Sequence, residues 1–158
     1  MSADAYSLVK TLHVLGAMVV FGTGIGTAFQ MLLAHRSGET VVVARVARGT
    51  VRADWLFTTP AMILQPVTGL VLAVWAGYGL ADRWLVLSVA LFAAAALCWL
   101  PVVVIQIRMA RLAEAAARSG TALPPAYRRL FRIWFALGWP ALAAMLAIVH
   151  LMVSKPGW

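Results

Sequence analysis

Histidine is the side chain in this sequence best suited to bind a haem iron or another metal near neutral pH. The chain contains three histidines, His13, His35 and His150. His13 and His150 lie within long apolar runs, where an ionisable side chain is costly and usually faces a bundle interior, a water cavity or a cofactor. His35 instead precedes Arg36, which is typical of an exposed residue at a helix end. We therefore treat His13 and His150 as candidate ligands.

The composition identifies the elements that must position these histidines. Of the 158 residues, 63% are hydrophobic and only 11% are charged, which indicates a membrane protein. Four apolar spans separate, at about residues 6–34, 55–81, 84–112 and 128–154. Runs of this length without alternating polarity predict transmembrane helices and not barrel strands. The expected fold is an all-α, up-and-down bundle of four transmembrane helices, forming one domain over residues 1–158 with both termini outside.

The positive charges are concentrated in the two segments that join spans one to two and three to four. The formal net charge is +8, and the arginines in these segments are Arg36, Arg45, Arg48 and Arg52 in the first and Arg108, Arg111, Arg118, Arg128, Arg129 and Arg132 in the second. This pattern predicts a protein of a bacterial inner membrane whose two basic segments both lie on the cytoplasmic side. The expected partner of the basic residues is the lipid bilayer and not nucleic acid. The segment VVVARVARGTVRAD of residues 41–54 is expected to form a short amphipathic helix at the cytoplasmic surface.

The predicted topology places the two candidate histidines at a common depth. His13 lies ~5–9 Å and His150 ~6 Å below the outer boundary, at 1.5 Å per helical residue. Ala17 and Ala147 lie one turn away from them and leave room for a large flat ligand such as haem. The alternative is that both histidines face lipid headgroups and that the small residues serve helix packing. A site for a metal ion alone would need more ligands, and no acidic residue or cysteine is well placed in this layer.

Other polar residues within the spans are less informative. Gln30, Thr58, Thr59 and Gln106 are interpreted as hydrogen-bonding groups between helices, since none of them titrates near neutrality. Trp99, Trp134 and Trp139 lie deeper than the aromatic belts at the predicted helix ends, and the sequence gives no simple reason for them.

Three stretches resemble a known family. LVKTLHVLGAM at residues 8–18 resembles the first helix of the HemJ-type protoporphyrinogen oxidases, which are membrane-embedded haem b proteins with a haem-ligating histidine in that helix. TPAMILQPVTG at residues 59–69 resembles their second helix, and residues 127–156 resemble their last. The chain is also similar to a bacterial group of four-helix integral membrane proteins. The resemblance implies a bound haem b with His13 as a ligand.

Two departures from the HemJ pattern affect the expected activity. The family's essential lysine in helix three is replaced by Ser88, and its Asn-Glu-x-Pro in helix four by LGWP at residues 137–140. A serine cannot supply the lysine's charge, which argues against porphyrinogen oxidation. The same alignment places His150 where the family usually has an aliphatic residue. From this exchange and the common depth of the histidines we infer a haem site with His13 and His150 as iron ligands, lined by Ala17, Ser88 and Ala147.

Three functions remain open at this point. The first is electron transfer by a six-coordinate b-type haem, with a quinone or a porphyrin as partner. The second is an active porphyrinogen or quinol oxidoreductase in which Ser88 and His150 replace the missing lysine. The third is a cofactor-free membrane assembly or transport subunit whose small-residue faces bind partner helices, including a second copy of the chain.

Overall fold

The computed structural model describes residues 2–156 and is helical throughout that range, without a strand. The elements in chain order are α1 (Ala3–Ser37), α2 (Thr40–Ala53), the π-helical turn η1 (Asp54–Thr58), α3 (Thr59–Trp75), α4 (Arg83–Arg118) and α5 (Pro125–Ser154). Four helical stretches are long and apolar enough to cross a membrane, namely Ala3–Ser37, Thr40–Trp75, Arg83–Arg118 and Pro125–Ser154. This confirms the predicted all-α fold with four spans.

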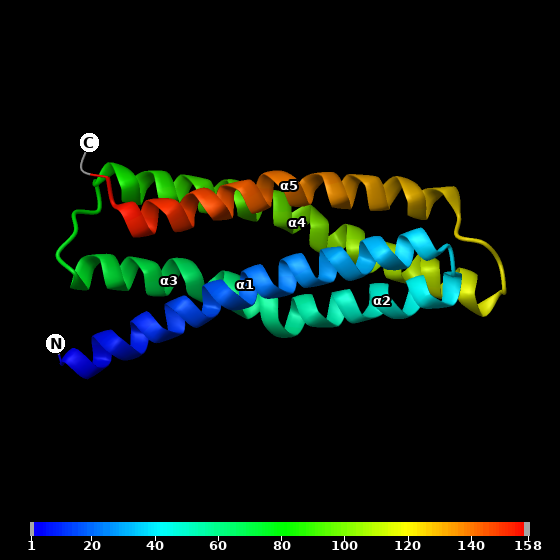
Figure 1. Ribbon diagram of the computed structural model, residues 1–158, viewed down its shortest axis with the longest axis horizontal. Helices are drawn as coiled ribbons and strands as arrows, with labels where there is room; N and C mark the ends of the chain where they lie inside the picture. Colours follow the sequence, from blue (N-terminus) through cyan, green and yellow to red (C-terminus); the bar gives the residue numbers. More distant parts are fainter. Residues whose placement is uncertain (1, 157–158) are drawn as a thin grey trace.

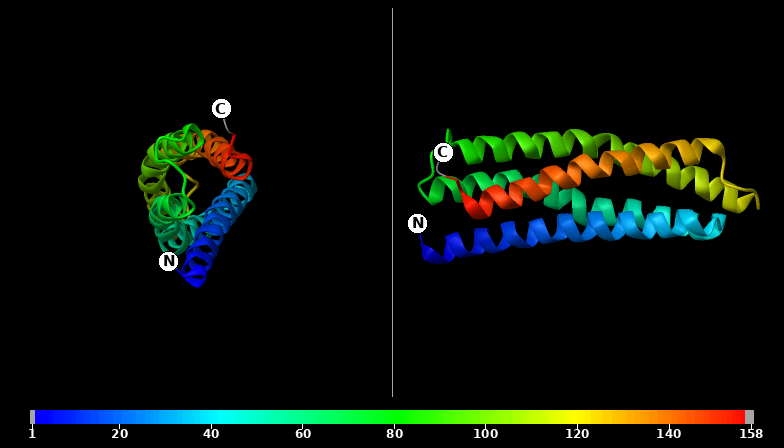
Figure 2. Two further views of the ribbon diagram at one scale, coloured as in Figure 1. Left: turned by 90° about the vertical axis from the view of Figure 1, so that its left-hand side faces the viewer. Right: turned by 45° about the horizontal axis from the view of Figure 1, so that its top comes forward.

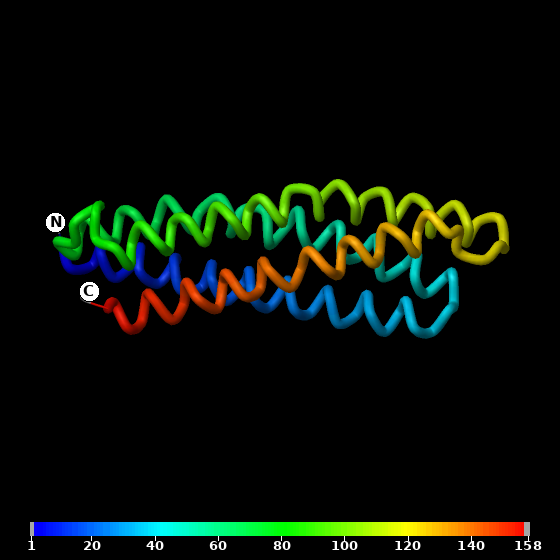
Figure 3. Tube along the Cα trace, turned by 90° about the horizontal axis from the view of Figure 1, so that it is seen from above, coloured from blue at the N-terminus to red at the C-terminus, as the bar shows by residue number. Residues whose placement is uncertain are grey.

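The chain ends lie together at one end of the elongated bundle, which we call the termini end (Figures 1 and 3). Large apolar side chains such as Leu8, Ile63 and Val153 are exposed along the helices, as lipid contact requires. Three of the four long stretches end at a glycine with positive φ, a conformation that glycine adopts without steric cost. These glycines are Gly38 after α1 (φ 72°), Gly77 after α3 (φ 80°) and Gly120 after α4 (φ 64°).

The second long helix begins earlier than the apolar run suggests. α2 continues through η1 into α3, so that one helical stretch runs from Thr40 to Trp75. α2 buries Val43, Ala44 and Ala47 against α1 and α4, while its arginines lie outside this buried stripe. The arginines interrupt the run of apolar residues but not the helical period. α2 is therefore part of the bundle and not the separate surface helix expected for residues 41–54 (Figure 1).

Two hydrophobic cores close the two ends of the bundle. The larger core lies away from the termini, where α1, α2, α4 and α5 meet around residues such as Met31, Met109 and Tyr127. The smaller core, at the termini end, joins Ala73 of α3 to Trp84 and Leu85 of α4 and Leu151 of α5.

The closely packed helix pairs are α4 with α5, α2 with α4, α1 with α3, and α1 with α2. Over the residues that the structure describes, α1 and α5 are not among these pairs. The N-terminal turns of α1 also lie apart from the C-terminal turns of α5 (Figures 1 and 2). The two helices that carry His13 and His150 therefore flank a loosely packed side of the bundle.

Candidate functional site

His13 lies in the interface between α1 and α3 and is held there by a side-chain hydrogen bond. Its Nδ1 is 2.8 Å from Oγ1 of Thr68, and the Thr68 hydroxyl donates to the carbonyl oxygen of Leu64 at 2.7 Å. Because the single hydroxyl proton is used in this way, Nδ1 carries a proton and donates it to Thr68. The Nε2 atom then bears the lone pair. Metal-ligating histidines are commonly oriented by such a bond from the other ring nitrogen.

Two glycines allow α1 and α3 to approach closely at His13. A Cβ atom on Gly69 would lie 3.1 Å from Cε1 of His13, and one on Gly16 would lie 2.5 Å from Nε2 of Gln65. Gln65 is buried and donates from that nitrogen to the main-chain oxygen of His13 at 2.8 Å. Both the ring and the backbone of His13 are therefore fixed by α3.

Substituting Gly16 with alanine is expected to displace the Gln65 amide from the His13 carbonyl. A buried amide left without its partner costs about 1–3 kcal/mol, so the free energy of unfolding in detergent should fall by that amount. Gly26→Ala provides the matched control, since a Cβ atom there meets nothing within 4 Å. Equal unfolding free energies for the two variants would show that the Gln65 contact does not stabilise the helix pair.

The structure does not join His150 to His13. His150 is exposed on α5, and no hydrogen bond or ring stacking involving its imidazole occurs among the described residues. The two histidines share the termini end, but their pairing stays a prediction. Ala17 and Ala147 are half-buried. Ser88 is buried, and its hydroxyl donates to the carbonyl oxygen of Trp84 at 2.7 Å.

His35 is not the exposed end residue that its position beside Arg36 suggested. Its ring is half-buried and stacks on Phe131 with centroids 3.9 Å apart, and Tyr127 lies on the same side. The sequence expectation was wrong because the larger core extends to the end of α1 and encloses the residue with aromatic side chains of α5.

A cavity of about 410 Å³ lies in the middle of the bundle, between the two cores, and we call it the central cavity. Its walls come from α1, η1, α3, α4 and α5 and are mostly apolar. The polar side chains in the wall are Thr27, Asp54, Thr58 and Gln106, together with the indoles of Trp99, Trp134 and Trp139. Pockets of this volume and composition are typical sites for small ligands.

Asp54 is the most unusual of these residues. It begins the π-helical turn η1 and is only 7% exposed, yet no basic side chain forms an ion pair with it in the described part of the chain. Its Oδ1 accepts a hydrogen bond from Nε1 of Trp99 at 3.2 Å, whereas Oδ2 is buried without a partner. π-helical turns occur often at functional sites, and a carboxyl inside a membrane bundle is a functional candidate by its cost alone.

Gln106 forms the second half of this polar cluster. It is 3% exposed, and its Oε1 accepts from Nε1 of Trp134 at 3.4 Å. Gln106 and Thr58 both lie close enough to the Asp54 carboxyl to interact with it, although Nε2 of Gln106 makes no hydrogen bond of ordinary geometry. Two of the three tryptophans that the sequence left unexplained, Trp99 and Trp134, thus hold a buried carboxyl and a buried amide.

Asp54 was not predicted as a site residue, because it falls at the end of the segment expected to lie at the cytoplasmic surface. The signal that could have found Asp54 is the helical spacing of the valines and alanines in residues 41–51. This spacing continues into the charge-free run after Asp54. Following that period as one helix would have placed Asp54 inside the bundle, on the same helix as Thr58.

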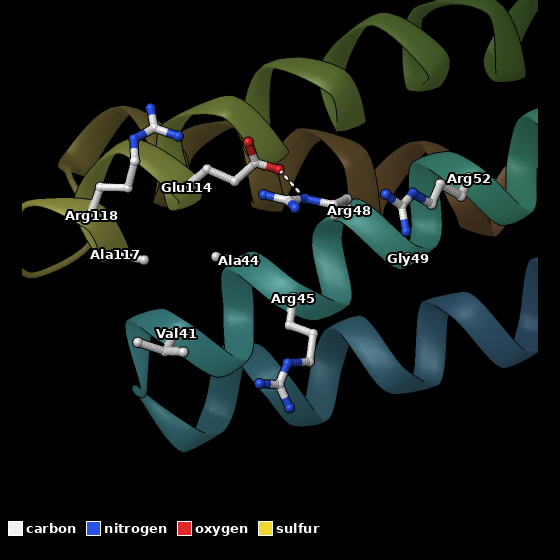
Figure 4. Close-up of a pocket in the computed structure, with 9 residues that line it drawn as sticks. All are labelled: Val41, Ala44, Arg45, Arg48, Gly49, Arg52, Glu114, Ala117 and Arg118. Carbon is white, nitrogen blue, oxygen red and sulfur yellow. Dashed lines mark hydrogen bonds and ion pairs between the residues drawn. The ribbon is translucent and has the colours of Figure 1, made fainter.

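The arginines of α2 lie along an open groove of about 630 Å³ at the end of the bundle away from the termini. Arg45, Arg48 and Arg52 of α2 and Arg118 of α4 line it, and Arg48 Nε is paired with Glu114 Oε1 at 2.7 Å (Figure 4). The basic residues of the first segment therefore lie at the opposite end of the molecule from His13, as the predicted topology requires.

The chain matches one family model, described as "Predicted integral membrane protein (DUF2269)", over residues 7–156. No curated protein and no solved structure matches it. The family description names no haem and no enzyme activity, so the resemblance to HemJ-type oxidases stays a prediction. The match includes nearly all of the four membrane-crossing helices. The chain therefore belongs to this family of predicted integral membrane proteins.

Proposed function

We propose that the protein binds b-type haem near the termini end, where Nε2 of His13 would hold the iron, and that it serves in electron transfer. The observation that carries the proposal is the hydrogen bond from Nδ1 of His13 to Thr68. That bond fixes the tautomer in which Nε2 can bind iron, and it fixes the ring orientation before iron binds.

In this proposal the haem would lie between α1 and α5. α1 and α5 are loosely packed against each other, and Ala17 and Ala147 present small side chains on the two helices. His150 on α5 is the proposed second ligand, since it lies at the same end of the bundle. Bound haem would supply a one-electron couple, and two histidine ligands favour electron transfer over oxygen binding. Thr68 and Gln65 would position His13, and the apolar helix faces would exclude water.

The proposed location follows from the charges. The arginine-rich end would face the cytoplasm of a bacterial cell and the termini end the outside of the inner membrane. A quinone or a porphyrin is the proposed electron partner. The oxidase alternative requires Ser88 and His150 to form a joint site, and it gains no support. The Ser88 hydroxyl donates a hydrogen bond to the main-chain oxygen of Trp84, and His150 is exposed.

Thr68→Val tests the proposal through the positioning residue. The variant removes the acceptor for Nδ1 of His13, and loss of such an outer partner typically weakens binding of the metal by about 10–100-fold. Haem affinity is measured by titrating haem into the purified protein and recording absorbance. Thr68→Ser should restore tight binding because it keeps the hydroxyl.

Thr11→Val is the matched control, since Thr11 bonds only to the carbonyl oxygen of Ser7 in its own helix. If Thr68→Val and Thr11→Val bound haem with the same affinity as the unmodified protein, His13 would not act as the oriented ligand.

A further inference from the structure

We propose that the central cavity binds a membrane-soluble phenol of the quinol class, whose hydroxyl donates to Oδ2 of Asp54 and accepts from Nε2 of Gln106. The proposal is independent of haem binding, because it rests on residues of the central cavity that do not contact His13.

The two buried atoms without partners define the ligand's polar group. Buried polar atoms in folded proteins nearly always have a hydrogen-bond partner, so two orphans facing one cavity require an explanation. Oδ2 of Asp54 accepts, and Nε2 of Gln106 donates. A hydroxyl group satisfies both atoms. Against an ionised Asp54 carboxyl, an ammonium group would leave the amide unpaired, a ketone would leave Oδ2 unpaired, and an anion would be repelled by the carboxylate.

The walls define the rest of the ligand. Phe21, Trp99, Trp134, Phe135 and Trp139 line the cavity and offer aromatic surfaces on which a ring can stack. The volume of about 410 Å³ greatly exceeds the ~30 Å³ of one water molecule, so the cavity has room for a ligand much larger than a bridging water. A substituted aromatic ring with part of an alkyl chain matches both the size and the lining.

The position of the cavity indicates how such a ligand enters. Ile25, Phe29 and Trp139 line the cavity and are also 53%, 59% and 61% exposed. The rim of the cavity therefore opens on the lipid-facing surface, at the loosely packed side between α1 and α5. A molecule dissolved in the bilayer can reach Asp54 by this route without passing through water.

A pair of probe compounds tests whether the cavity recognises a hydroxyl. The purified protein in detergent is titrated calorimetrically, without oxygen, with tert-butylhydroquinone and with its dimethyl ether. The ether has the same substituted ring, with a methyl group on each oxygen in place of the proton, so it cannot donate. A hydrogen bond to a carboxylate is worth about a 10–100-fold change in affinity, so the hydroquinone should bind at least tenfold more tightly. Equal affinities, or no binding of the hydroquinone, would overturn the proposal.

Two variants place the binding in the cavity. Asp54→Asn should weaken hydroquinone binding about tenfold or more. Trp99 would keep its hydrogen bond to the one side-chain oxygen that remains, so the amide nitrogen would replace Oδ2, the atom that accepts from the ligand. Glu114→Gln makes the same change in a carboxyl of the arginine groove and should have no effect.

Gly24→Leu keeps the polar pair but fills the cavity, because Gly24 lines it and a Cβ atom there meets nothing within 4 Å. Binding should be lost in this variant and retained in Gly22→Leu, which has equal space outside the lining. Hydroquinone affinity unchanged by Gly24→Leu would overturn the assignment to the cavity, whether or not Asp54→Asn folds.

Discussion

Replacing His13 with alanine is expected to abolish haem binding, so that the purified variant lacks the Soret band that the unmodified protein shows. The reason is that His13 supplies the only imidazole held by α3 at the termini end, through Thr68 and Gln65. The alanine side chain offers no iron ligand, and His150, whose exposed ring no other helix holds in place, is expected not to retain the haem by itself. Haem content per protein is measured by absorbance after purification from cells supplied with haem.

His35→Ala is the control for this experiment. His35 is also an imidazole on α1, but it stacks on Phe131 at the other end of the helix and should leave haem content unchanged. A variant lacking His13 that kept its full haem content, or an equal loss in both variants, would remove His13 from the proposed site.

Replacing His150 with alanine is expected to change the iron from six-coordinate to five-coordinate without releasing the haem. His150 is exposed on α5 and has no partner to lose, so the fold should be unaffected. The reduced variant should then bind carbon monoxide nearly stoichiometrically, while the unmodified protein, with both axial positions occupied, binds little.

Val153→Ala, at a nearby exposed position of α5, is the control and should behave like the unmodified protein. If His150→Ala left the spectrum and the carbon monoxide reactivity unchanged, the second ligand would be another group, and the assignment of His13 would stand by itself.

The fold could be predicted from the sequence because each of its four spans is long, apolar and free of alternating polarity. Such runs can satisfy their backbone hydrogen bonds in a bilayer only as helices. The start of the second helix could not be read in the same way. Arg45, Arg48 and Arg52 lower the local hydropathy, although the valines and alanines between them keep a helical period that packs on α1 and α4.

The site could be predicted only in part. His13 was identifiable because an isolated imidazole in an apolar helix is conspicuous, but its fixed tautomer depends on Thr68, which is 55 residues away in the sequence. Asp54 and Gln106 were harder to find because neither is unusual by position. Only the folded bundle brings Asp54 to Trp99 of α4, and Gln106 of α4 to Trp134 of α5. Contacts between distant helices are set by side-chain shape, which periodicity does not encode.

The reduced-minus-oxidised absorbance spectrum of the unmodified protein, purified in detergent from cells supplied with haem, bears on every part of the proposed function. A sharp Soret difference with a visible α-band, at close to one haem per chain, is the predicted result for a histidine-ligated b-type haem. A flat difference spectrum from folded protein would contradict it.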